Sequence, residues 1–138
     1  MTLFAKINRI SFKLLRKQPN AWHITDSKLE EKILQRGVLP ISRLRPELAG
    51  LAEDSATQFK RNHVYYYIAK MGCKDEIQAF LKFANNRVII PLFLPKSIIS
   101  NSESDHTYGH NTSRRYQGHI SPYYIGNACE LSSIEESS

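Results

Sequence analysis

Residues 21–40 constrain the fold of this chain more than any other stretch, because they contain the pattern of a strand, a turn, one helix and a stop. In the first five residues apolar and polar side chains alternate, which predicts a strand with Trp22 and Ile24 on one face. His23 and Thr25 then share the opposite face. The stretch therefore predicts a strand that presents a histidine and a threonine side by side.

The helix after this strand has a beginning and an end in the sequence. Asp26 or Ser27 can cap it, because a short polar side chain accepts a hydrogen bond from the first free backbone N–H groups. Its apolar side chains recur at helical spacing and form one stripe against a core: Leu29, Ile33 and Leu34. Gly37 ends the helix and Pro40 prevents its resumption. We therefore expect this helix to pack behind the strand.

The composition is typical of one globular domain with an anionic partner. The chain has 138 residues, of which 41% are hydrophobic, so it can bury a sizeable core. Its net charge of +6 favours nucleic acid, a dinucleotide or an acidic protein as partner, and a merely basic domain is the alternative. Cys73 and Cys129 are too few for a metal site of their own or a disulfide framework, which indicates a reduced, intracellular setting.

No membrane span is predicted. No apolar run approaches the roughly 20 residues that such a helix needs, and basic residues interrupt every apolar run near the N-terminus. We therefore expect a cytoplasmic protein, or one delivered into a host cell without a signal peptide. Residues 2–17 have the apolar spacing of a basic amphipathic helix, which either packs on the sheet or contacts phosphates.

The rest of the chain continues as one α+β domain, with no internal repeat or domain boundary in residues 1–138. The expected elements follow in this order: a loop after residue 40, an aromatic strand at 63–69, a helix at 74–84, an apolar strand at 87–94, a long polar loop at 97–113, extended pieces at 114–120 and 121–125, and a frayed tail at 132–138. Pro91 marks a bulge or an unpaired edge in the apolar strand.

The order of elements over residues 21–131 resembles the ADP-ribosyltransferase superfamily, in its small intracellular branches. The family begins with a strand carrying His-x-Thr or His-x-Ser and a helix ending in I-L-x-x-G, which matches His23, Thr25 and residues 33–37. The H-V-Y-Y-Y run at 63–67 resembles the corresponding strand of poly(ADP-ribose) polymerases and of tRNA 2′-phosphotransferases. This resemblance implies an α+β fold with a split, mixed or antiparallel sheet and flanking helices.

A second match lies near the C-terminus. The run G-H-I-S-P-Y-Y-I at 118–125 resembles the V-P-P-x-Y-I ending of the phosphotransferases. The polymerases carry a catalytic glutamate on a late strand, and the nearest position here is Gln117. Gln117 can bind a ribose hydroxyl through its amide but lacks the charge of a carboxylate.

The resemblance implies NAD as the substrate and assigns a role to each candidate residue. His23 would bind the adenosine ribose and Thr25 the nicotinamide ribose, since both side chains point the same way from one strand. His23, Tyr66 and Gln117 are the expected catalytic set. Nicotinamide needs an aromatic wall, and the aromatic candidates for it are Tyr65, Tyr66, Tyr67 and Phe80.

Some of these residues also have a purely structural explanation. His23 could be a satisfied structural histidine, and Phe80 could belong to the core. Arg43 and Arg45 lie on the loop that would run past the NAD site, where arginine can bind the pyrophosphate, or they face solvent. No metal is expected, because the spacing of the three histidines between 106 and 119 lacks a zinc pattern.

We therefore expect an NAD-dependent mono-ADP-ribosyltransferase that modifies nucleic acid or a protein. Small free-standing members of this fold often act as toxins or effectors, which implies an antitoxin or immunity protein as a further partner. Two alternatives stay open. One is a non-catalytic module of the same fold that binds ADP-ribose or nucleic acid, and the other is an RNA 2′-phosphotransferase-like enzyme.

Overall fold

The computed structural model describes residues 18–44 and 62–136, and its centre is one five-stranded sheet. The strands are β1 (Ala21–Asp26), β2 (His63–Ile68), β3 (Arg87–Leu92), β4 (Glu103–Ser104) and β5 (Ser113–Gln117). They lie in the order β3-β1-β2-β5-β4, and each of these neighbouring pairs is antiparallel. The α+β class is therefore confirmed, with an antiparallel sheet.

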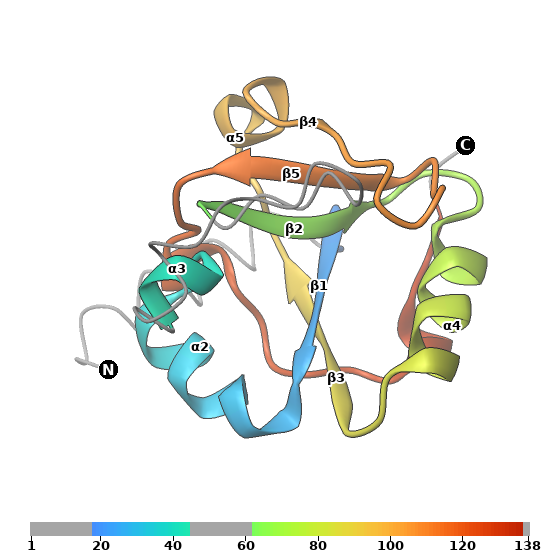
Figure 1. Ribbon diagram of the computed structural model, residues 1–138, viewed down its shortest axis with the longest axis horizontal. Coiled ribbons are helices and arrows are strands. Elements are labelled where there is room, and N and C mark those ends of the chain that lie inside the picture. The colour runs from blue at the N-terminus through green and yellow to red at the C-terminus, as the bar shows by residue number, and fades with distance from the viewer. Residues whose placement is uncertain (1–17, 45–61, 137–138) are drawn as a thin grey trace.

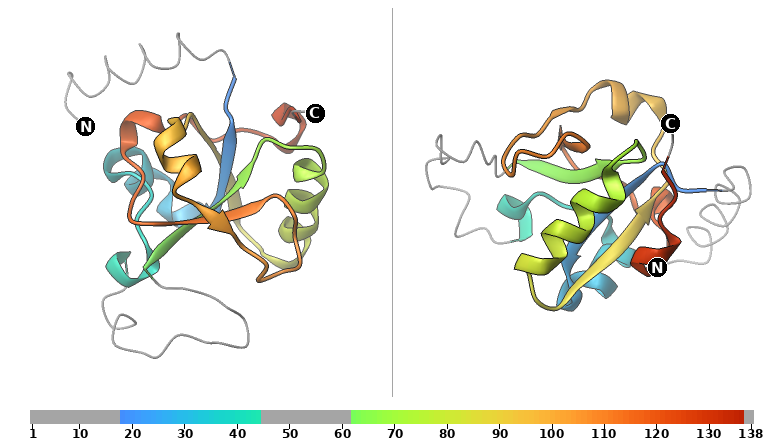
Figure 2. Two further views of the ribbon diagram at one scale, coloured as in Figure 1. Left: turned by 90° about the horizontal axis from the view of Figure 1, so that it is seen from above. Right: turned by 90° about the vertical axis from the view of Figure 1, so that its right-hand side faces the viewer.

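Short helices cover both faces of this sheet. They are the 3₁₀ turn η1 (Ser27–Leu29), α2 (Glu30–Arg36), α3 (Ile41–Leu44), α4 (Cys73–Phe83), α5 (Lys96–Ser100), η3 (Pro122–Tyr124) and η4 (Leu131–Ser133). The helices α2 and α5 lie on one side of the strands and α4 lies on the other (Figure 1; Figure 2, left). No helix within the described ranges is long and apolar enough to cross a membrane.

Two hydrophobic clusters follow from this layering. The larger joins the strands to α2 and α5, and its members include Ala21, Ile33, Val64, Tyr66, Ile90, Leu92 and Ile98. The smaller joins the strands to α4, and its members are Trp22, Tyr67, Cys73, Ile77, Ile89 and Ile134. Successive residues of β1 and β2 enter different clusters, because side chains alternate between the faces of a strand.

The strand–turn–helix at the start of the described chain forms as predicted. The Asp26 side chain accepts a hydrogen bond from the backbone N–H of Lys28 at 2.9 Å and so caps the turn before α2. Gly37 ends α2 with φ of +89°, and a Cβ there would come within 2.0 Å of the Ile120 carbonyl oxygen. Glycine is required at this position, because Val38 forms a backbone bridge with Ile120 immediately after it.

The sheet is split between β1 and β2. β1 pairs with β3 at six positions, but it pairs with β2 only where Ala21 faces Ile68 and Trp22 faces Tyr67. Beyond these two pairs the strands diverge, and in Figure 1 β1 and β3 run steeply while β2 and β5 run across the top. The split leaves space between two halves of one sheet.

The segments after β3 are more ordered than their polar sequences predicted. Residues 97–113 contain most of α5 and all of β4, and 122–124 form the 3₁₀ turn η3 instead of an extended piece. The tail is packed as far as Glu136, because Ile134 is buried and the Glu136 carboxylate accepts a hydrogen bond from the Lys74 N–H at 3.0 Å. The burial of Ile134 stabilises a packed conformation of this tail, although most of the residues around it are polar.

Three expectations concern residues outside the described ranges. These are the amphipathic helix at 2–17, the loop from 45 to 61 with Arg45, and the last two residues. Pro91 lies within β3 opposite Trp22, and β3 is the end strand of the five-strand order, a position where proline is tolerated.

Candidate functional site

A cavity of about 350 Å³ lies at the split of the sheet. β1 and the helices that follow it contribute one wall: His23, Ile24, Thr25, Leu29, Lys32, Leu39 and Ile41. β2 contributes a second wall, from His63 to Tyr67. The remaining lining residues come from segments distant in sequence: Phe80, Arg87, Asp105, Thr107, Tyr108 and Ser113. The cavity therefore collects side chains from both halves of the sheet.

His23 lies across the split and connects its two sides. Its Nδ1 atom is 2.6 Å from the carbonyl oxygen of Tyr65 on β2. Because a carbonyl can only accept, Nδ1 carries the proton and Nε2 is left as an acceptor. Burial lowers the pKa of His23 below its usual value, and the hydrogen bond to the Tyr65 carbonyl offsets this only in part. A neutral imidazole with a free acceptor suits a hydroxyl donor, such as that of a sugar.

Thr25 lies two residues further along β1, on the same face as His23, and it also lines the cavity. The pair is placed by the alternation of the strand and by the ladder to β3, in which His23 faces Ile90 and Thr25 faces Val88. The geometry thus brings together the histidine and threonine that the sequence pattern paired.

The three tyrosines of β2 divide between the two faces. Tyr66 is buried in the larger cluster, and its hydroxyl donates to the Ser102 Oγ at 2.6 Å. Tyr65 and Tyr67 point to the other face. The Tyr67 hydroxyl is 2.9 Å from His110 Nδ1. The pKa of Tyr67 is raised by burial and by the charges of Glu76 and Asp105. All three line the cavity, so the aromatic strand does supply a wall.

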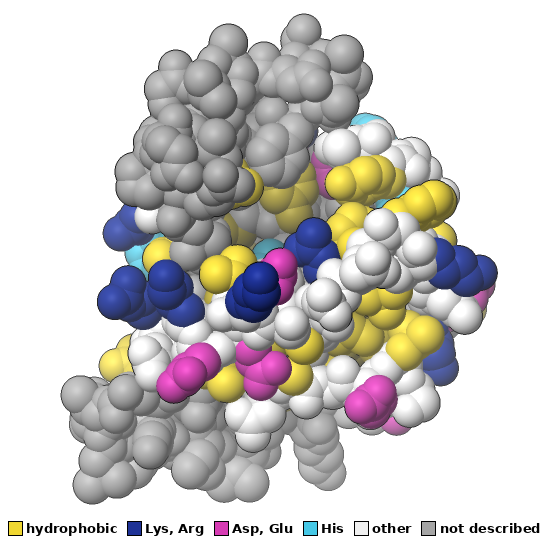
Figure 3. Space-filling model, turned by 60° about the horizontal axis from the view of Figure 1, so that its bottom comes forward, with side chains coloured by type: hydrophobic (Ala, Val, Ile, Leu, Met, Phe, Trp, Pro, Cys, Tyr) yellow, Lys and Arg dark blue, Asp and Glu magenta, His cyan; other side chains and the backbone are white. Residues whose placement is uncertain are grey.

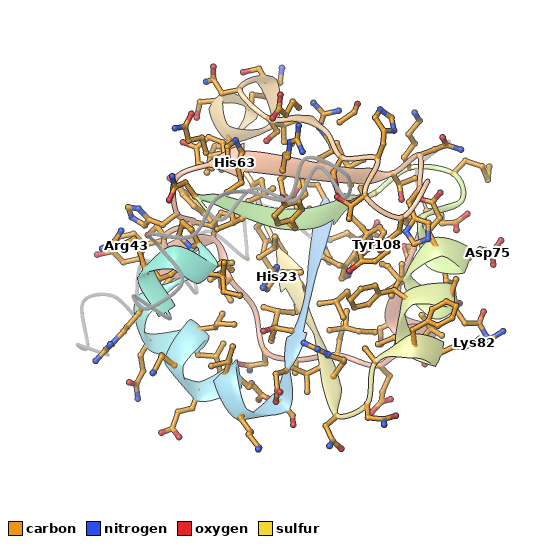
Figure 4. The ribbon with its side chains drawn as sticks, in the orientation of Figure 1. His23, Arg43, His63, Asp75, Lys82 and Tyr108 are labelled. Atoms are coloured by element: carbon orange, nitrogen blue, oxygen red, sulfur yellow. The ribbon has the colours of Figure 1, made fainter. Side chains whose placement is uncertain are left out.

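Phe80 of α4 and Tyr108 of the β4–β5 segment meet at one end of the cavity. Their ring centroids are 5.4 Å apart in an edge-to-face arrangement, which is a favourable geometry for an aromatic pair. In Figure 4, Tyr108 lies on the opposite side of β1 from the α2 and α3 helices. Phe80 lines the cavity and is half-buried, so it is not a fully buried core residue.

The sequence reasoning missed Asp105, which is the carboxylate of the cavity. It is 2% exposed and accepts hydrogen bonds from the Thr107 N–H at 3.1 Å, from the Thr107 hydroxyl and from the Ser113 hydroxyl at 2.8 Å. Three donors therefore surround the two oxygens of this buried carboxylate. The pattern Asp105-x-Thr107 is an Asx turn, and that signal was present in the sequence.

Glu76 of α4 holds the β4–β5 segment in place. Its carboxylate accepts hydrogen bonds from the Thr112 N–H at 2.8 Å, the Thr112 hydroxyl and the Asn111 N–H at 2.7 Å. Burial raises the pKa of Glu76, but these hydrogen bonds outweigh burial and the net shift is downward. This contact connects the helix that carries Phe80 to the segment that carries Asp105 and Tyr108.

An ion pair between a buried arginine and an exposed glutamate lies next to the β2 wall. The Arg115 Nε donates to Glu103 Oε1 at 2.6 Å, and His63 Nε2 lies 3.7 Å from the same oxygen. Burial lowers the pKa of Arg115, but the bond and charge of Glu103 outweigh burial and raise it overall. The pair fixes β4, β5 and β2 relative to one another at this edge.

Two predicted site residues within the described ranges do not line the cavity. Gln117 is exposed at the end of β5, opposite His63. Arg43 is exposed on α3 and lies toward the left-hand edge of Figure 4, apart from His23. Lys32 and Arg87 are the cationic side chains that do line it, and neither was singled out from the sequence.

The lowered pKa of His23 makes a testable prediction about stability. An unfolded histidine takes up a proton near pH 6.5, whereas the folded His23 does so only at lower pH. The unfolded state therefore binds more protons in this window, and the free energy of unfolding falls as the pH drops below about 6.5. The variant His23→Gln retains a donor for the Tyr65 carbonyl but has no imidazole to protonate, so its free energy of unfolding lacks this dependence on pH.

The measurement is the melting temperature of both proteins between about pH 5 and pH 8, which spans the ordinary histidine pKa. The wild type should lose stability relative to His23→Gln as the pH falls, while the other histidines contribute equally to both. Parallel curves would show that His23 titrates normally and is not buried as described.

Metal ligands and known relatives add nothing further to the site. Among residues 18–44 and 62–136, no group of three or more His, Cys, Asp or Glu side chains is placed to hold a metal ion. No protein-family model matches this chain, and no curated protein matches it either.

Proposed function

We propose that this protein is an NAD-dependent mono-ADP-ribosyltransferase. The observation that carries the proposal is the cavity at the split between β1 and β2. There the His23 and Thr25 pair lies against an aromatic wall drawn from β2, α4 and the β4–β5 segment. A split sheet with His-x-Thr on its first strand is what the resemblance to ADP-ribosyltransferases implied.

The cavity offers a contact for each part of NAD. Neutral His23 can accept a hydrogen bond from a ribose hydroxyl, and Thr25 can bond the second ribose. Tyr67, Phe80 and Tyr108 provide flat surfaces for nicotinamide. Lys32 and Arg87 provide positive charge for the pyrophosphate, the role that the loop arginines were expected to fill.

Breaking the bond between nicotinamide and ribose builds positive charge on the ribose, in an oxocarbenium-like transition state. A fixed negative charge nearby stabilises that state, because it requires no reorganisation as the charge develops. Asp105 is such a charge, held by three donors on the cavity wall. We propose that Asp105 fills the role that the polymerases give to a glutamate.

A second candidate function is a non-catalytic module that binds ADP-ribose or nucleic acid. The position of Gln117 favours it, because this residue is exposed at the end of β5 and does not line the cavity. The same contacts to ribose and pyrophosphate would then serve binding alone. Release of nicotinamide from NAD separates the two functions.

The proposed function is tested through His23. We expect wild-type protein to bind NAD in calorimetry and to release nicotinamide, and we expect His23→Ala to lose measurable binding, since it removes the ribose acceptor. His23→Ala should keep the far-UV circular dichroism of the wild type, because the ladder between β1 and β3 is made by the backbone. Unchanged NAD affinity would remove His23 from the site, and a collapsed fold would identify it as structural.

The acceptor and the partners remain predictions. Nucleic acid or a protein could receive the ADP-ribose, and a toxin or effector role would require an antitoxin or immunity protein. The net charge of +6 supports an acidic partner in either case.

A further inference from the structure

A group of exposed and half-buried aromatic side chains lies beside the cavity and extends beyond the two members, Phe80 and Tyr108, that are assigned to nicotinamide. We call it the aromatic shelf: Phe80, Phe83, Tyr108 and His110. Phe83 is 90% exposed and Tyr108 is 63% exposed, although large aromatic side chains are normally among the more buried residues. The four residues line a second hollow together with Ala84 and Arg87.

Three of the four rings of the aromatic shelf contact one another, and Phe83 projects beside them. Tyr108 contacts Phe80 with ring centroids 5.4 Å apart and contacts His110 at 6.0 Å. His110 in turn contacts Tyr67, whose hydroxyl it meets at 2.9 Å. The Glu76 carboxylate, bonded to the backbone at residues 111 and 112, ties this segment to α4. A ligand would therefore meet three rings that already support one another, which lowers the entropic cost of binding.

Exposed cationic side chains lie next to the aromatic shelf along the chain. Lys82 and Arg87 are exposed and lie close to it in sequence, and Arg87 lines both hollows. The carboxylates of Glu76 and Asp105 also lie near it, where both accept hydrogen bonds within the protein and Asp105 is buried. Figure 3 shows hydrophobic side chains gathered on its right-hand side, with both basic and acidic side chains around them.

We propose that the aromatic shelf binds unpaired bases of single-stranded nucleic acid. Exposed ring faces stack on bases, and each stacked base contributes enough to be measured by alanine substitution. Lys82 and Arg87 would bind the phosphates on either side. A duplex hides its base faces, so the shelf prefers single strands. Phe80, Tyr108 and Arg87 line both hollows, so a nucleic acid bound on the shelf would lie next to NAD in the cavity. That this nucleic acid is the acceptor of ADP-ribose rests on the proposed function.

Adenine of NAD is a second source of the same stacking chemistry. The two sources are separated through Phe83, which lines the second hollow but not the cavity, because NAD affinity depends on Phe83 only if adenine stacks on the shelf. Binding assays that contain no NAD also keep this proposal separate from the enzymatic one.

The test measures the fluorescence anisotropy of a labelled single strand of about 20 nucleotides, long enough to cover one such site, and of the matching duplex. Wild-type protein should bind the single strand more tightly. Phe83→Ala should weaken that binding about 10-fold, the loss of roughly one stacked base, and Phe83→Trp should retain it. Lys82→Gln should reduce the salt dependence by about one phosphate contact. Met71→Ala is the matched control, since Met71 is 65% exposed and precedes α4, whereas Phe83 ends it.

Several results would overturn the proposal. Equal losses in Phe83→Ala and Met71→Ala, or equal affinity for single strand and duplex, would assign the binding to net charge. A loss of NAD affinity in Phe83→Ala would assign the shelf to adenine, and no binding of either oligonucleotide would leave a protein as the acceptor. Nicotinamide release by the wild type is measured separately without nucleic acid, so its absence would contradict the proposed function and leave the shelf result intact.

Discussion

Asp105→Asn should lower nicotinamide release from NAD by roughly 100- to 1000-fold, the loss typical of removing one preorganised electrostatic contact to a transition state. The substitution removes the negative charge and little else. The asparagine oxygen can still accept from the Thr107 N–H, and its amide can donate to the Ser113 hydroxyl. The melting temperature should therefore change far less than the rate.

Gln117→Ala is the matched comparison, because Gln117 was the third catalytic residue predicted from the sequence and is exposed outside the cavity. If Asp105 supplies the charge, nicotinamide release under equal NAD falls in Asp105→Asn and stays near wild type in Gln117→Ala. The reverse result would restore Gln117 to the site and make Asp105 a structural residue. If nicotinamide release stays at the wild-type rate in both variants, neither Asp105 nor Gln117 takes part in catalysis.

Ile33→Asp should unfold the domain. Ile33 is 2% exposed in the larger cluster, where aspartate would leave a cavity and bury a carboxylate with no partner. We expect a loss of about 5 kcal/mol, which is comparable with the total stability of a small domain, about 5 to 15 kcal/mol. The measurement is thermal unfolding followed by circular dichroism.

Two neighbours on α2 calibrate this result. Leu34 is half-buried, so Leu34→Asp should destabilise the domain less than Ile33→Asp. Gln35 is exposed, so Gln35→Asp should cost less than about 1 kcal/mol. A melting temperature of Ile33→Asp within a few degrees of wild type would contradict the burial of this helix face and the organising role of residues 21–40.

The local elements of this fold were predictable from short-range patterns. The alternation around Trp22 and His23 predicted β1, and the spacing of Ile33 with Gly37 predicted α2 and its end. Such patterns are reliable because backbone geometry imposes a period of 2 on strands and about 3.6 on helices. The same alternation placed Tyr66 on one face of β2 and Tyr65 and Tyr67 on the other.

The ends and connections were less predictable, because a single distant contact decides them. Ile134 packs against the smaller cluster and orders a tail whose composition predicted fraying. Asp105 organises a polar segment through hydrogen bonds to Thr107 and Ser113, and its serine partner is eight residues away. Composition averages over residues, so it does not detect one buried side chain.

Short-range sequence patterns were enough to predict the α+β class, the strand that carries His23 and Thr25, and the helix that packs behind it, because each depends on neighbours within a few residues. The side chains that surround that pair, in contrast, are fixed by the packing of the whole domain. The split after Trp22 and Tyr67 opens the cavity, and the Glu76 contact brings the Asp105 segment to it. Both depend on contacts between residues more than 30 positions apart, and chain entropy leaves such contacts undefined until the domain packs.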